Sequence, residues 1–186
     1  MANPDRPNGF TPVKTISGAP VSSVLRAYGV ADGEDIFVGD MVNLESGLAD
    51  PMATNDAAVL GAVVAIGKKV NGQIVSGFDP AKLNPDQIYY DDSASTHTDY
   101  FVLVAPADDC IYEVQSNADL DITQGGVCDL VDATGEVTTG RSRQEVGAST
   151  NADFTVIEIP DYPDNDSTLA NTRYWVMVTR AEQAHF

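Results

Sequence analysis

Residues 99–115 read DYFVLVAPADDCIYEVQ and contain two apolar runs, 99–106 and 110–115, separated by a short polar stretch. Valine, phenylalanine, tyrosine and isoleucine dominate both runs, and these side chains favour strands. Runs of four to eight such residues, bounded by Pro, Gly, Asn or Asp, are typical of β-strands. We therefore predict two strands here.

The same pattern recurs along the chain, whereas helical periodicity is hard to find. The predicted strands are 23–30, 35–44, 60–70, 73–78, 99–106, 110–115, 127–132, 136–140, 154–160 and 173–180. In the last of them, apolar side chains fall on both faces, which predicts a strand that is covered on both sides or lies at an interface. A length of 186 residues suits one domain. The fold class we predict is all-β, a single compact β-barrel or β-sandwich.

Turn residues support this prediction. Asn71-Gly72 is a strong hairpin signal, because both residues accept positive φ. Thr134-Gly135 is expected to join the strands 127–132 and 136–140. Helix is expected at most briefly, at residues 79–83, where Pro80 suits the first helical position. Another turn is expected at residues 149–154.

The first residues differ from the rest. Residues 3–15, NPDRPNGFTPVKT, hold three prolines, which exclude a helix. We predict that residues 1–22 form an extended N-terminal arm and residues 23–186 a single β domain. Residues 1–30 hold three cations, two of them in the arm, and have a net charge of +2 against −20 for residues 31–186. So acidic a body disfavours binding to nucleic acid.

The acidic residues and the two cysteines are the candidate metal ligands of this sequence. Residues 117–128 place acids as in an EF-hand loop, but Ile122 and Cys128 stand where glycine and glutamate are required. The acids of residues 161–166 are better explained as solvated turn residues than as an irregular calcium site. Cys110 and Cys128 are expected to be buried free thiols. We predict no metal site and no cofactor.

Catalytic and phosphate-binding motifs are also missing from the sequence. No serine lies in a nucleophile-elbow frame, and no GxxxxGK[ST] or strand-borne GxGxxG occurs. His97 lies in a polar stretch and His185 is the penultimate residue. We predict no catalytic residues and no enzyme. No apolar run reaches the length of a membrane span.

The order of several short motifs resembles a known family. Near the start these are Pro7, Gly9, Phe10, Pro12, Val13 and Lys14, followed by Tyr28 and by Gly39-Asp40. An aromatic-acid-x-Gln strand follows at Tyr112, Glu113 and Gln115, and residues 163–166 read PDND before a last hydrophobic strand. In this order the chain resembles the cement, or decoration, proteins of tailed-bacteriophage capsids. The acidity of the body and residues 70–95 depart from that pattern.

The resemblance implies a structural virion protein that binds the outer surface of a phage head and stabilises the major capsid protein lattice. It implies self-association, with trimers common, and a location on the outer capsid surface after synthesis in the host cytoplasm, with no nucleic acid or membrane partner. The docking residues would lie in the arm: Arg6, Pro7, Gly9, Phe10, Pro12 and Lys14. Phe10 would be the apolar anchor.

Three alternatives stay open. The chain fits a β-sandwich adhesin or carbohydrate-binding module that uses Tyr89, Tyr90 and Tyr162 as exposed aromatics. Another phage head or tail protein would share most of these signals. A small hydrolase would have to be centred on His97 and nearby acids.

Overall fold

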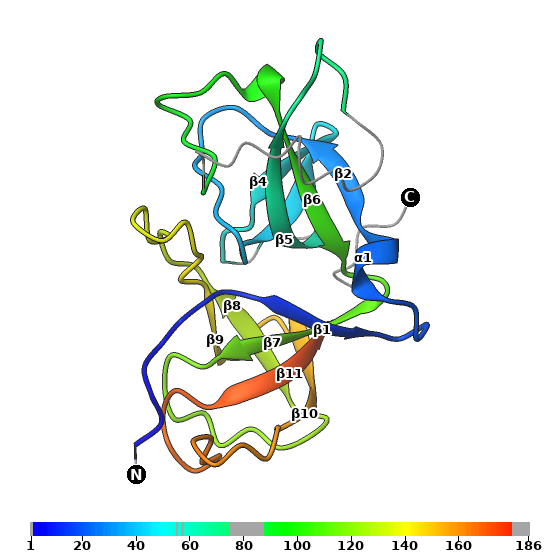
Figure 1. Cartoon of the computed structure of the whole chain (residues 1–186). Coiled ribbons are helices and arrows are strands. Elements are labelled where there is room, and N and C mark those ends of the chain that lie inside the picture. The colour runs from blue at the N-terminus through cyan, green and yellow to red at the C-terminus, as the bar shows by residue number, and fades with distance from the viewer. Residues whose placement is uncertain (1, 55, 57, 75–87, 180–186) are drawn as a thin grey trace.

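The prediction of an all-β protein is confirmed. The computed structural model describes residues 2–54, 56, 58–74 and 88–179, and these form two antiparallel sheets (Figure 1). Within the described residues, helix is limited to the four-residue α1, Val21–Val24, and a 3-10 turn at His97–Asp99. No described helix is long and apolar enough to span a membrane.

The described residues form eleven strands. Their bounds are β1 Thr11–Thr15, β2 Arg26–Gly29, β3 Met41–Glu45, β4 Leu48–Pro51, β5 Val59–Lys68, β6 Tyr100–Pro106, β7 Cys110–Gln115, β8 Val127–Val131, β9 Glu145–Ala148, β10 Phe154–Glu158 and β11 Arg173–Val178. The strand order is β2-β6-β5-β3-β4 in the five-stranded sheet and β1-β7-β11-β10-β8-β9 in the six-stranded sheet.

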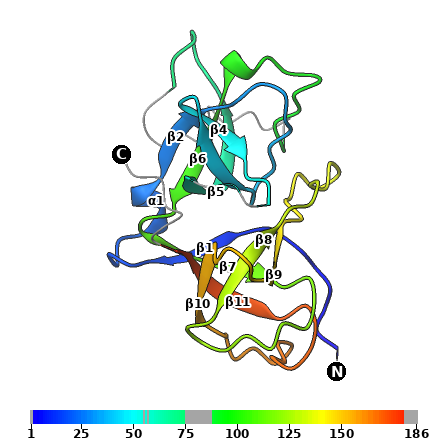
Figure 2. The same cartoon turned by 180° about the vertical axis from the view of Figure 1, so that it is seen from behind.

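Each sheet closes on itself. In the five-stranded sheet, Val30 just after β2 bridges in parallel to Ala49 of β4. In the six-stranded sheet, Ser116 just after β7 bridges in parallel to Val146 of β9. We call β2–β6 the first unit and β7–β11 the second unit; they are the upper and lower halves of Figure 1, and Figure 2 shows them from behind.

The two units share one connectivity. In each, the first strand pairs with the fifth, the fifth with the fourth, the fourth with the second and the second with the third. Even the bulge between the fourth and fifth strands recurs, between Val63 and Ala65 and between Val156 and Glu158. The fold is therefore a structural repeat, although the sequence does not repeat.

A common core joins the units. A first cluster of buried side chains, including Val42, Val63 and Tyr90, fills the first unit. A larger cluster holds Met41 and Val59 of the first unit together with side chains from all five strands of the second. The largest hydrophobic cluster therefore spans both units.

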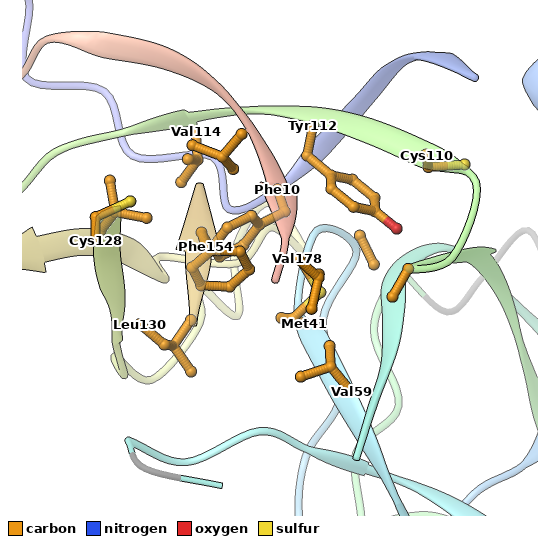
Figure 3. Packing of buried hydrophobic residues seen from close by; sticks show 14 of the residues in the cluster. Phe10, Met41, Val59, Cys110, Tyr112, Val114, Cys128, Leu130, Phe154 and Val178 are labelled. Atoms are coloured by element: carbon orange, nitrogen blue, oxygen red, sulfur yellow. The ribbon is translucent and has the colours of Figure 1, made fainter. Parts of the chain in front are cut away.

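The prediction of an arm that precedes the domain needs correction. Phe10 is completely buried in the chain's own core, where its ring stacks on Phe154 at 4.9 Å between centroids and meets Tyr112 edge-on at 6.4 Å (Figure 3). The Phe10 backbone N–H also donates to the Gly39 carbonyl at 2.8 Å. The reason is physical: a phenylalanine that can reach an apolar core within its own chain does not stay in water.

Further contacts fix the segment on both sides of Phe10. Strand β1, which the sequence did not predict, pairs with β7 from Thr11 to Thr15. Nearer the start, the Asn3 amide donates to the backbone carbonyl of Asp166 at 2.9 Å and accepts the Asp166 N–H at 2.7 Å. Residues 2–15, which we call the N-terminal segment, thus belong to the second unit.

Other local predictions met mixed outcomes. The Asn71-Gly72 hairpin is confirmed, with both residues at positive φ between the bridged Val70 and Gln73. The strand expected at 136–140 is wrong, because residues 132–144 leave the sheet and reach the first unit. The start of strand 23–30 is the last turn of α1 instead. Most of strand 73–78 and the helix expected at 79–83 lie outside the described residues.

Candidate interaction face

The structure divides the six predicted docking residues into three groups. Phe10 and Gly9 are buried, Pro7 and Pro12 are half-buried, and Arg6 and Lys14 are exposed. The role predicted for Phe10, an anchor in a partner, is therefore wrong for the folded chain, since its ring is part of the core. The exposed cations remain available to a partner.

Gly9 is a packing residue. Its φ is +62°, and a Cβ at this position would lie 2.4 Å from the Gly39 carbonyl oxygen and 2.4 Å from the Cβ of Ser142. Only glycine allows such a close approach of two backbones. Gly9 thus lets the N-terminal segment cross the Gly39-Asp40 turn, and the two glycines of the sequence motifs lie against each other.

Aromatic and charged side chains alternate on the outer face of β1, β7 and β11. The Lys14 ammonium lies 4.5 Å from the centre of the Trp175 ring, and the Trp175 indole N–H donates to Glu113 at 3.0 Å. Glu113 also accepts the Tyr162 hydroxyl at 2.9 Å, and the Arg173 guanidinium stacks 4.5 Å above the Tyr162 ring. We call Arg6, Lys14, Glu113, Tyr162, Arg173 and Trp175 the arm face.

Strand periodicity explains how Trp175 reaches this face. Tyr174, Val176 and Val178 of β11 point inward and are fully buried, whereas Trp175 points outward and is only half-buried. The apolar residues on both faces of this strand were the sequence signal for an interface. No such signal marked Arg173, whose place depends on the pairing of β11 with β7.

Hydrogen bonds and ion pairs fix the side chains of the arm face. The hydrogen bond from Tyr162 to Glu113, together with burial, raises the pKa of Tyr162, so its hydroxyl stays a donor. Lys14 also lies 3.7 Å from Glu158, and Arg173 pairs with Asp164. These contacts hold long side chains in place, and Trp, Tyr and Arg are the residues that most often dominate protein interfaces.

A shallow hollow lies beside this face. It measures about 190 Å³ and is lined by the N-terminal segment on one side and by β7 and β11 on the other, including Pro4, Arg6, Gln115 and Arg173. The Arg6 backbone N–H donates to the Gln115 side chain at 3.0 Å, which orients the segment along this edge. The hollow gives the arm face a recess.

A second, larger cleft of about 470 Å³ lies where the two units meet. Its lining carries seven carboxyl groups: Glu34, Asp35, Asp40, Asp50, Asp56, Asp92 and Asp132. Even so, the described residues contain no group of three or more His, Cys, Asp or Glu side chains arranged to hold a metal ion. Cys110 and Cys128 are buried free thiols, as predicted.

The aromatic residues of the adhesin alternative and the histidine of the hydrolase alternative have different surroundings. Tyr90, expected as an exposed aromatic, is completely buried and so cannot stack on a glycan; that expectation is wrong. Tyr89 stacks on Phe37 at 4.7 Å between ring centroids. His97 Nδ1 lies 3.0 Å from Asp32, whose side chain is 75% exposed, so this pair sits in a strongly hydrated loop.

Comparison with known proteins adds no relative. No protein family matches this chain, and no match was found among curated proteins or among solved structures.

Proposed function

We propose that this protein is a capsid decoration subunit, which binds the outer surface of a phage head and reinforces the major capsid protein lattice through its arm face. The observation that carries the proposal is the arm face itself, where Lys14 of the family-like motif lies over Trp175. Arg6, just before that motif, lines the same hollow as Arg173. The motif that resembles the decoration proteins therefore contributes directly to the most interface-like surface we identify.

Charge supports an outer location. The chain has a net charge of −18, and packaged DNA would repel such a protein from the inner side of a shell. Three of its ten cations, Arg6, Lys14 and Arg173, belong to the arm face. A partner surface that is acidic or rich in carbonyl groups complements this face, and self-association into trimers is part of the same proposal.

The test uses point variants, because removing residues 1–15 would also remove Phe10, Asn3 and β1 from the fold. We expect purified wild-type protein to co-sediment with phage heads assembled without it. Lys14→Glu should weaken this binding at least tenfold, since it places a carboxylate over the Trp175 ring and beside Glu158.

The matched control is Lys68→Glu. Lys68 makes the same kind of contact in the first unit, with its ammonium 5.5 Å from the centre of the Tyr100 ring. Both variants change the net charge equally, so only the location differs. Equal loss of binding in both, or no binding of the wild type to heads, would overturn the proposal; binding to a glycan matrix instead would favour the adhesin.

A further inference from the structure

One connection of the second unit holds the first unit. Residues 132–144, between β8 and β9, leave the second unit and lie against the first (the yellow loop in Figure 1); we call them the strap. The Val38 N–H donates to Gly140 at 3.0 Å and the Ser142 N–H to Val38 at 2.9 Å. Gln144 accepts the Met41 N–H at 2.7 Å and donates to Met52 at 3.1 Å.

Asp40 lies at the centre of these contacts. Its side chain is almost completely buried, with 3% of the residue exposed. The carboxyl accepts the Phe37 N–H at 2.7 Å and is hydrogen-bonded to the hydroxyl of Ser142, which is itself fully buried in the strap. The two units are therefore joined through an ionisable group that is almost completely buried.

The surroundings of Asp40 disfavour its charge. The cleft on which it borders carries Glu34 and Asp35 before β3, Asp50 and Asp56 around β4, Asp92 before β6 and Asp132 in the strap. No lysine, arginine or histidine is among the residues that line this cleft. Burial penalises the ionised form of Asp40 most, and the charge of Asp132 adds to this penalty. Together they outweigh the hydrogen bonds from Phe37 and Ser142.

We propose that Asp40 and the strap form a pH-sensitive latch between the two units, which stays closed while the Asp40 carboxyl is neutral and opens more often once it is ionised. Opening lets water reach the carboxylate and separates it from Asp132. The proton leaves Asp40 to solvent, and no other chemistry is needed. This device is independent of capsid binding, so each can fail without the other.

The size of the effect follows from linkage. Burial, with a further contribution from Asp132, raises the pKa of Asp40 from the ordinary 3.8 to about 7 in the closed state. If opening restores the ordinary value, the opening constant rises about tenfold per pH unit between these limits and then levels off. Across the whole interval the increase is roughly a thousandfold.

The test is hydrogen exchange at the strap. Exchange of the Val38 and Ser142 amides is measured by NMR from pH 4 to 8 and divided by the intrinsic rate at each pH. We expect the opening constant to rise up to pH 7 in the wild type and to stay flat in Asp40→Asn. In Asp132→Asn, the opening constant should still rise with pH but level off at a lower pH, because one repelling charge near Asp40 is gone.

Two controls make the outcome decisive. Asp161→Asn removes an exposed acid of the β10–β11 connection and should leave the profile unchanged. The Val114 amide within β7 should show no such rise in any variant. A flat wild-type profile, or a rise that persists in Asp40→Asn, would overturn the proposal. If Asp40→Asn does not fold, the wild-type profile decides the outcome on its own.

Discussion

The two units have the same strand order but different connections between their second and third strands. In the first unit, β3 and β4 are joined by a tight turn at Ser46 and Gly47. In the second, β8 and β9 are joined by the strap, which crosses to the first unit. The second unit also gains β1 beside β7, whereas no described strand takes this place beside β2. The second unit therefore carries two segments without a described counterpart in the first, the strap and β1, and the strap contacts the first unit.

The side chains at equivalent positions differ as much as the connections. The pairing registers place Leu103 of β6 and Trp175 of β11 at the same point, as they do Asn43 of β3 and Asp129 of β8. Leu103 is buried, with 7% exposed, whereas Trp175 is half-buried under Lys14. The two units thus share a backbone arrangement but carry different side chains, and only the second unit has an interface-like face.

The largest expected effect concerns the shared core. Phe10→Ala should cost about 3–5 kcal/mol of unfolding free energy, because it leaves a cavity between Phe154 and Tyr112. Urea denaturation should still show one transition, at a lower midpoint, since the core spans both units. Two separate transitions would contradict a shared core, and the half-buried Pro12→Ala is the control.

The junction between the units should respond to pH. A raised pKa means that folding favours neutral Asp40, so its ionisation costs stability above the ordinary pKa of 3.8, increasingly until about 7. Asp40→Asn removes this penalty. Its unfolding free energy relative to the wild type should therefore rise by about 4 kcal/mol between pH 3.5 and pH 7. A constant difference across this range, measured by urea denaturation, would show that Asp40 is not the buried titrating group.

Asp129 and Asn43 allow a direct comparison of the units. Burial alone would raise the pKa of Asp129, but N–H groups of residues 150–153 and the Ser149 hydroxyl outweigh it and lower the pKa to about 2. The side-chain amide of Asn43 donates to Asp56 at 3.2 Å. We expect Asp129→Ala to cost about 3 kcal/mol and Asn43→Ala about 1 kcal/mol.

The unfolding free energies of the Asp129 and Asn43 variants should also depend on pH in different ways. Because the pKa of Asp129 is lowered, its stabilisation is present above pH 3.8 and is lost as the pH falls towards 2. The difference in unfolding free energy between Asp129→Ala and the wild type should shrink over this range. The corresponding difference for Asn43→Ala should not change. Equal costs at neutral pH would mean that the two positions are equivalent after all.

The smallest effects are expected on the surface. Lys14→Gln and Lys68→Gln each remove one cation–π contact and should each lower the unfolding free energy by about 0.5 kcal/mol. Circular dichroism melts would show this similarity. If Lys14→Gln alone were strongly destabilising, a loss of head binding in Lys14 variants would report unfolding instead of a lost contact.

Local sequence patterns predicted the strands that carry their own propensity and missed those that depend on pairing. Strand β7 was predicted with its observed bounds, and β5, β6, β8, β10 and β11 within a few residues. Strands β1, β4 and β9 are short, and they contain Pro12, Pro51 and Gly147; only their partners make them strands. The repeat stayed hidden because its connections differ in length and its equivalent side chains differ in type.

The candidate site was predicted only in part. Arg6 and Lys14 were among the predicted docking residues, but their role was assigned together with Phe10. A sequence does not show whether an apolar anchor meets its own core or a partner. The apolar pattern of β11 pointed to an interface at Trp175. Tyr162 and Arg173 come together with Glu113 through long-range pairing, which local patterns do not reveal.

The orientation of the protein on a head tests the central claim most directly. A cryo-EM reconstruction of heads decorated with the wild-type protein would show which surface faces the shell. We predict that the outer face of β1, β7 and β11, with Lys14 and Trp175, contacts the major capsid protein or a neighbouring subunit. Density that leaves this face exposed to solvent, with the first unit against the shell, would contradict the account.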